Sequence, residues 1–390
     1  MTTATPSKLK RSEKAAGEPV YIDKSDPFAS FLRDRLGMDW LNAWFFAFLI
    51  YGIFEKIILP SIGGYLNLSG SIKTWTPHVE SLLTGFVEFP FFFGYYMWSG
   101  SAIVHLLDSL EDNKSFADPA QFKTFRGKML KAYNSPWPAI IGLIFAIAAM
   151  VLMHFVVWGP KAVVPPWFGN RLYARLLSLV LVGIVAYIIF QIFYREIVSV
   201  IWLRRLWSER SGKLVIHPYR ADGAGGLGSI GNHAVGLFIF FVILLLFIFM
   251  ATILPSFLAS TEPDTPISLR LWSPLLIAIW VAYLTLLPLM YFLLIWPPRQ
   301  AMIRERDRRI NDYSTQLDEQ LKKAQSLAES DRSKLEEVYK DIKNLKDMRN
   351  LVLEDYPVWP VSTQSKRLFG LTSALPTVYS FLTFVFELLK

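Results

Sequence analysis

Cysteine is absent from this chain of 390 residues, and charged residues make up only 18% of it. The absence of cysteine excludes disulfides, thiolate metal sites and a cysteine nucleophile. The chain also lacks the G-x-S-x-G and H-E-x-x-H motifs and a catalytic paired-carboxylate motif on a helix. Its histidines and carboxylates have no regular spacing that would predict a metal site. These absences argue against an enzyme, and they give no reason to expect a cofactor or a bound metal.

Charge is missing altogether from several long stretches. Five of them are 19 residues or longer: 138–158, 176–194, 234–254, 271–298 and 368–386. Two more, 40–59 and 81–107, are long and apolar with only one or two charges. A helix needs ~20 apolar residues to cross the ~30 Å hydrocarbon layer of a bilayer. The sequence therefore predicts an all-α integral membrane protein in contact with lipid.

The expected membrane domain, 39–296, contains six transmembrane helices. Their predicted ranges are 40–59, 79–107, 138–158, 174–198, 233–257 and 272–296. Seven Lys and Arg residues precede the first helix, in the N-terminal segment 1–38, and connections 108–137 and 195–231 carry five and six. The intervening connections carry one or two each. Because Lys and Arg concentrate on the cytoplasmic side, both ends of the chain are expected in the cytoplasm.

The composition changes sharply after the sixth predicted helix. Pro297 and Pro298 are expected to end that helix, and the segment 297–356 that follows is highly charged. Its apolar residues recur at two heptad positions: Ile303, Ile310, Leu317, Ala324, Val338 and Leu345 at one, and Leu321, Ala328, Leu335 and Ile342 at the other. This pattern predicts an amphipathic helix able to form a coiled coil. Asp331 interrupts it, which indicates either a polar layer in one helix or the bend of a helical hairpin.

The C-terminal segment 357–390 is ambiguous. Its charge-free run follows Lys366 and Arg367, as a seventh transmembrane helix would. A polar stripe also recurs in it at helical spacing: Ser373, Thr377, Ser380, Thr383 and Glu387. A stripe of this kind is typical of a helix lying in the interface, or of one that lines water. We favour an interfacial or re-entrant helix, and we treat Ser373, Thr377 and Ser380 as candidate pore-lining residues.

Three glutamates lie in or beside the predicted spans: Glu55, Glu80 and Glu88. Glu88 lies deepest, and a carboxylate inside a membrane is costly unless it faces protein or water. Together the three are candidates for an acidic vestibule that concentrates cations. The alternative is that Glu88 pairs with Lys56 while the other two reach the lipid headgroups.

A further group of polar residues lies near the predicted cytoplasmic boundary. It comprises His105, Asp108, Gln191, Arg195 and Glu196. We interpret this group as a structural polar network rather than as a path for protons.

The most distinctive connection runs from His217 to the start of the fifth predicted helix. Its candidate ligand residues are His217, Arg220, Asp222, Gly223, Gly225, Gly226 and Gly228. It contains a G-x-G-x-x-G, but neither a preceding strand nor a following lysine, so it fits neither a dinucleotide fold nor a P-loop. Exposed backbone N–H groups at the helix start, with Arg220 beside them, could hold a phosphate. The favoured alternative is that the glycines let the connection pack tightly under the bundle.

Two local patterns resemble those of a group of uncharacterised bacterial polytopic membrane proteins. One is His217-Pro218 followed by Asp222-Gly-Ala-Gly-Gly-Leu-Gly228, and the other is Pro357-Val-Trp359-Pro360. That group has His-Pro-Asp directly before the glycines, whereas Tyr219-Arg220-Ala221 is inserted here. The resemblance covers roughly 214–231 and 297–380 and implies a multi-pass protein of the bacterial inner membrane. More loosely, the arrangement is similar to membrane effectors of anti-phage systems of the Hailong type, in which a nucleotide-derived signal controls a channel.

These features lead us to expect a homo-oligomeric, ion-conducting membrane protein. A cytoplasmic ligand, such as a nucleotide or oligonucleotide signal, or a cytoplasmic partner protein would gate it. A secondary transporter is one alternative, although 40–158 and 174–296 show no clear internal repeat of the kind that many transporters carry. A non-conducting scaffold or receptor that works through its cytoplasmic helix is the other.

Overall fold

The structure is a computed structural model that describes residues 25–58, 84–152, 154–155, 172–207, 215–217, 220, 222–259, 267–328 and 332–361. All regular elements in these ranges are helices, as predicted. In chain order they are α1 (Pro27–Ser30), η1 (Phe31–Arg35), α2 (Trp40–Ala47), η2 (Phe48–Ile58), η5 (Thr84–Glu88), α5 (Phe89–Asp112), α6 (Pro119–Tyr133), α7 (Trp137–Leu152), α8 (Leu172–Leu206), α9 (Gly228–Ala259), α10 (Ile267–Ala328) and α11 (Arg332–Asp355). The label η denotes a π-helical segment.

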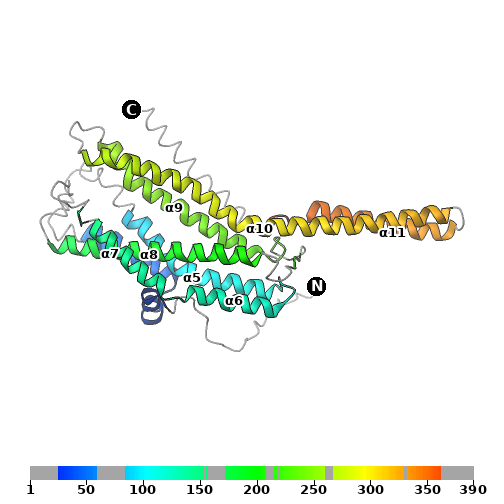
Figure 1. Cartoon of the computed structure of the whole chain (residues 1–390), viewed down its shortest axis with the longest axis horizontal. Helices are drawn as coiled ribbons and strands as arrows, with labels where there is room; N and C mark the ends of the chain where they lie inside the picture. Colours follow the sequence, from blue (N-terminus) through cyan, green and yellow to red (C-terminus); the bar gives the residue numbers. More distant parts are fainter. Residues whose placement is uncertain are drawn as a thin grey trace, which may run out of the picture.

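The helices form an elongated bundle from which α10 and α11 project together (Figure 1). Helix α5 is central and contacts α2, α8 and α9. Its aromatic and aliphatic side chains Phe92, Tyr96, Leu107 and Leu110 are fully buried. Burial of this many large apolar groups makes α5 the core of the bundle, because hydrophobic stabilisation grows with the apolar area removed from water.

Among the residues that the structure describes, three stretches are long and apolar enough to cross a membrane: Trp40–Ile58, Pro119–Leu152 and Leu176–Leu206. The apolar part of the second stretch is α7, which covers most of the third predicted transmembrane helix, 138–158. Its outer side chains are largely exposed, with Ile144 at 61%. An apolar face of this extent suits contact with lipid. The described part of the chain therefore has the character of a membrane protein.

Helix α10 differs from the prediction at Pro297 and Pro298. The helix does not end there but runs without a break from Ile267 to Ala328. Two prolines remove two backbone donors, yet their fixed φ is compatible with a helix. Tertiary packing on both sides compensates, because Leu294 and Met302 are buried against the core. The expected boundary between the membrane domain and the charged segment thus lies inside one helix.

The two shapes left open for the charged segment are decided in favour of the hairpin. The distal half of α10 packs along α11, and the two run side by side in opposite directions (Figure 1). The α11 side of the seam is made by Leu335, Val338, Ile342, Leu345 and Val352, which are buried or half-buried. Their spacing of three and four residues matches a coiled-coil seam. On α10, Leu321 of the predicted pattern is 42% exposed, so the pattern is only partly buried within one chain.

One connection also contains a helix that the sequence did not predict. Within 108–137, α6 begins at Pro119, and the carboxylate of Asp118 accepts hydrogen bonds from the backbone N–H groups of Ala120 and Gln121. An aspartate cap followed by proline is a strong helix-start signal. Helix α6 packs on α8 through its buried residues, among them Phe122 and Met129.

Candidate functional site

Glu55 and Glu88 lie in two π-helical segments, η2 and η5, which contact each other. π-Helical segments are rare in proteins overall, but those that occur are often found at functional sites. They change the helical hydrogen-bond pattern and so redirect side chains. The two segments approach very closely at Gly85, where a Cβ atom would lie 2.8 Å from the carbonyl oxygen of Tyr51. A side chain at this position would push the two glutamate-bearing segments apart.

Glu88 is almost completely enclosed, with 1% of its surface exposed. Neither carboxylate oxygen accepts a hydrogen bond of standard geometry, although Thr84 lies one helical turn earlier and interacts with the group. The alternative pairing of Glu88 with Lys56 is not formed. Lys56 instead bonds Glu55 at 2.9 Å, which leaves the second oxygen of Glu55 buried without a partner. The two glutamates thus present buried acceptor oxygens that the described residues do not satisfy.

A second polar cluster is built around Asp26, in the N-terminal segment. Its carboxylate caps α1 by accepting hydrogen bonds from the N–H groups of Phe28 and Ala29. The same carboxylate accepts hydrogen bonds from the hydroxyls of Tyr96 and Tyr187, and it lies 3.0 Å from Nη2 of Arg195. One carboxylate thereby joins the N-terminal segment to α5 and α8.

Arg195 is also held by α5, on the side of its Nη1 atom. Its Nη1 donates to the carbonyl oxygen of Tyr96 at 2.6 Å and to the hydroxyl of Ser99 at 3.3 Å. Its guanidinium also lies 4.4 Å from the centre of the Tyr96 ring. Because Asp26 and Arg195 are both nearly fully buried, these contacts offset the cost of removing two charges from water.

The network continues from α8 to α9. The hydroxyl of Tyr95 donates to Glu196 at 2.9 Å, and Nε2 of His233 lies 3.1 Å from the other oxygen of Glu196. Gln191 donates to the carbonyl oxygen of Pro138 at the start of α7. The predicted polar network thus exists for three of its five members. His105 is exposed instead, and Asp108 pairs with Arg126 on α6.

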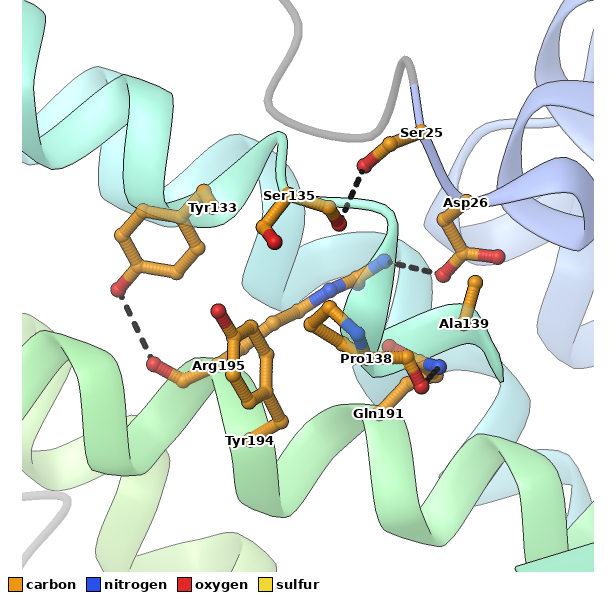
Figure 2. A pocket seen from close by; sticks show the side chains of 9 residues that line it. All are labelled: Ser25, Asp26, Tyr133, Ser135, Pro138, Ala139, Gln191, Tyr194 and Arg195. Carbon is orange, nitrogen blue, oxygen red and sulfur yellow. Dashed lines mark hydrogen bonds and ion pairs between the residues drawn. The ribbon is translucent and has the colours of Figure 1, made fainter. Parts of the chain in front are cut away.

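A small pocket opens beside this cluster (Figure 2). Its lining residues are Ser25, Asp26, Tyr133, Ser135, Pro138, Ala139, Gln191, Tyr194 and Arg195. Its polar groups largely bond one another: Ser25 donates to the carbonyl oxygen of Ser135, and Tyr133 donates to that of Arg195. The remaining space holds about one water molecule. The pocket is therefore part of a structural clamp rather than a substrate site.

Sequence reasoning missed Asp26, although Asp26-Pro27 carries a helix-cap signal.

The glycine connection is occupied by one of its own side chains. The carboxylate of Asp222 accepts hydrogen bonds from the N–H groups of Ala224, Gly226 and Gly228, at 3.0 to 3.2 Å. Asp222 thus fills the position at the start of α9 where a phosphate was considered. Gly225 and Gly226 have φ angles of +65° and +88°. These angles favour glycine, because a residue with a Cβ atom has a strained backbone there.

The other candidate ligand residues of this connection are also engaged by the protein. Arg220 donates to the side chain and the carbonyl oxygen of Asn113, at the end of α5. Asn113 in turn donates to the carbonyl oxygen of Gly226 at 2.9 Å. His217 donates its backbone N–H to Gly225, while its ring Nε2 is buried without a partner. The geometry matches the packing alternative, and a phosphate here would have to displace Asp222.

The structure brings together the two sequence patterns that carry the family resemblance. Gly231, in the first turn of α9, lies directly against Pro360 of the Pro-Val-Trp-Pro segment and against Val361, which follows it. Trp359 of that segment stacks on Arg299 of α10. The glycine connection, the Pro-Val-Trp-Pro segment and the middle of α10 therefore form one junction.

Four candidate residues lie outside the described residues: Glu80, Ser373, Thr377 and Ser380. Within the described ranges, no group of histidines and carboxylates could hold a metal ion. In comparisons with known proteins, no family model, curated protein or solved structure matches this chain.

Proposed function

We propose that this protein is an oligomeric, ion-conducting membrane protein gated through its cytoplasmic hairpin. The proposal rests mainly on the buried carboxylate of Glu88, which lies within an apolar helical segment, interacts with Thr84 and has no basic partner among the described residues. Placing a carboxylate at such a site is costly, and intramembrane carboxylates commonly mark ion or proton paths. Glu55, in the adjoining π-helical segment, adds a second acceptor for a cation.

Gating through the hairpin is supported by the continuity of α10. This helix of 62 residues would extend about 90 Å at 1.5 Å per residue. Its first part is apolar and its last part forms the hairpin with α11. A rigid element that belongs to both regions can transmit a change at the hairpin to the membrane helices.

In the proposed arrangement six helices cross the inner membrane of a bacterium, and both chain ends lie in the cytoplasm. A nucleotide or oligonucleotide signal, or a partner protein, would act on the cytoplasmic side. A role as an anti-phage effector is part of this proposal and rests on the architectural resemblance alone. Because Asp222 already fills the anion position of the glycine connection, the hairpin is the better candidate for signal recognition.

Recording from the purified protein in planar bilayers tests the proposal. We expect discrete current steps that select cations over anions, with an open probability that changes when candidate nucleotides are added on the hairpin side. Accumulation of a solute against its gradient without current steps would instead identify a transporter. Intact, folded protein that gives no current with any signal would contradict conduction.

The hairpin also favours a second candidate function, that of a non-conducting receptor. Helix α11 exposes large side chains away from its seam, including Tyr339 at 70% and Met348 at 53%. Exposed aromatic and methionine side chains are frequent in protein interfaces. A receptor would bind its partner through this face with no change in membrane conductance, so binding and conductance measured on one preparation separate the two functions.

A further inference from the structure

Arg299 occupies an unusual position on α10. It is the first charged residue after the charge-free run 271–298. Its guanidinium lies 4.4 Å from the centre of the Trp359 ring and 5.3 Å from that of Trp296. Two indole rings from different segments thus fix the orientation of one cation, since the π-face of tryptophan attracts cations strongly.

The charge of Arg299 is not balanced by any described residue. It forms no hydrogen bond or ion pair with them, and its Nε is buried without a partner. Two arginines further along α10 behave differently. Arg306 bonds Asp307, and Arg308 bonds Glu305. A guanidinium that is held by stacking, without a counter-ion, presents its N–H groups to an anion from outside.

An exposed apolar face of α10 leads to this cation. Leu289, Phe292 and Trp296 are 48%, 50% and 49% exposed. They precede Arg299 at helical spacing, ten, seven and three residues earlier, and so share one face with it. Tryptophan prefers the headgroup level of a bilayer, and the apolar face would lie at the depth of the lipid tails. The arrangement offers a surface for an acyl chain that ends at a cation.

From this arrangement we infer that Arg299, with Trp296 and Trp359, binds the phosphodiester headgroup of an anionic phospholipid. The planar guanidinium bonds two phosphate oxygens, while Leu289 and Phe292 contact the lipid tail. The site lies where α10 leaves its apolar part, next to the segment that packs on the start of α9. A bound lipid would therefore stabilise the junction between the membrane bundle and the hairpin. The inference does not depend on ion conduction.

The test compares lipid-dependent thermal stability and lipid retention in the full-length protein. Purified protein is delipidated in detergent and then titrated with phosphatidylglycerol, with zwitterionic phosphatidylcholine or with inorganic phosphate. Native mass spectrometry reports how much lipid stays bound. The variant is Arg299→Gln, and Arg304→Gln on the same helix is the matched control because it removes an exposed charge outside the apolar face. Arg299→Lys keeps the charge without the planar fork.

We expect phosphatidylglycerol to raise the melting temperature of the wild-type protein more than the other two additives do. Arg299→Gln should weaken phosphatidylglycerol binding about fivefold, the effect of one cation near an anionic headgroup, and Arg304→Gln should leave it unchanged. Arg299→Lys should fall between the two. The assignment is overturned if inorganic phosphate reproduces the stabilisation, or if Arg304→Gln has the same effect as Arg299→Gln. Should Arg299→Gln fail to fold, equal retention of both lipids by the wild-type protein also overturns it.

Discussion

Gly231 and Pro360 are in direct contact, although 129 positions separate them in the chain. A Cβ atom on Gly231 would lie 2.7 Å from the Cα atom of Val361, and closer still to the carbonyl of Pro360. Helix α9 and the Pro-Val-Trp-Pro segment therefore pack backbone against backbone. Only glycine allows this approach, because any side chain at position 231 would occupy the space of the opposing main chain.

Gly231→Ala should therefore destabilise the junction. Forcing one methyl group against a backbone that cannot yield costs about 1–3 kcal/mol. We expect a lower unfolding temperature and faster hydrogen exchange in 357–361. The matched control is Gly127→Ala in α6, where a Cβ atom meets nothing within 4 Å. That change should be neutral or stabilising by up to about 1 kcal/mol, since alanine favours helices over glycine. Equal effects of the two changes would show that the close contact is not significant.

The clamp between Asp26 and Arg195 predicts a coupled effect on stability. Removing one member of a buried ion pair costs about 3–5 kcal/mol, because the other charge loses its partner. We expect losses of this size for Asp26→Asn and for Arg195→Met, measured by unfolding in detergent. The double variant should lose less than the sum of the two, since no unpaired charge remains. Strict additivity would mean that the two side chains do not stabilise each other.

The hairpin seam predicts a contrast between two adjacent positions of α11. Val338 is 4% exposed and Tyr339 is 70% exposed. Val338→Lys should destabilise the hairpin by at least about 2 kcal/mol through lost burial and a buried charge. Tyr339→Lys should have little effect on stability. Thermal melting followed by circular dichroism compares the two, and similar losses would contradict the antiparallel seam.

The same seam bears on assembly. Leu335 and Ile342 are half-buried between α10 and α11. If the hairpin assembles subunits, Leu335→Lys combined with Ile342→Lys should reduce the oligomer as well as the helix content. Light scattering of the solubilised protein measures the oligomer. An unchanged oligomer with a disrupted hairpin would limit the seam to folding within one chain.

Glu88 and Glu55 predict different outcomes for the same substitution. Glu88→Gln removes a charge that has no basic partner in the described part, so folding should be retained while cation selectivity falls. Glu55→Gln removes the ion pair with Lys56 and should lower stability. Reversal potentials under a salt gradient measure selectivity, and thermal melting measures stability. A stable Glu88→Gln protein with unchanged selectivity would exclude Glu88 from the ion path.

The orientation of the chain can be tested on the background of a protein without cysteine. Thr261→Cys, in a connection with little positive charge, should react with an impermeant thiol reagent applied to intact cells. Ser326→Cys, exposed near the end of α10, should react only after lysis. The reverse pattern would show that Lys and Arg do not set the orientation as expected.

Helix content followed from the sequence because apolar runs and their lengths are local properties. Helices α8 and α9 enclose the ranges predicted for the fourth and fifth helices. The heptad pattern predicted an amphipathic helix with an apolar face, but periodicity cannot distinguish a partner in the same chain from one in another. Asp331 marked the interruption, and only the packing of the two helices showed that the chain turns back.

The continuation of α10 through Pro297 and Pro298 could not be predicted from local rules. Proline weakens a helix by removing donors, and what offsets that loss is the burial of Leu294 and Met302 against distant segments. The buried position of Asp26 could not be predicted from the sequence for a similar reason. Its partners Tyr96 and Arg195 are 70 and 169 residues away, and a single charged residue in a polar segment carries no local sign of burial.

The sequence by itself determined that this is a helical membrane protein. Apolar runs of ~20 residues are long enough to span a bilayer, and a helix satisfies all their backbone hydrogen bonds internally in lipid. The sequence also determined which residue types were available for a site: carboxylates and arginines, and no thiols. The tertiary structure decided which of these groups are satisfied. Asp222 and Asp26 are neutralised by donors that folding brings to them, whereas Glu88 and Arg299 are left without a partner of opposite charge among the described residues. Whether a charge is satisfied depends on groups distant in the chain, and for that reason only the folded protein distinguishes a structural charge from a functional one.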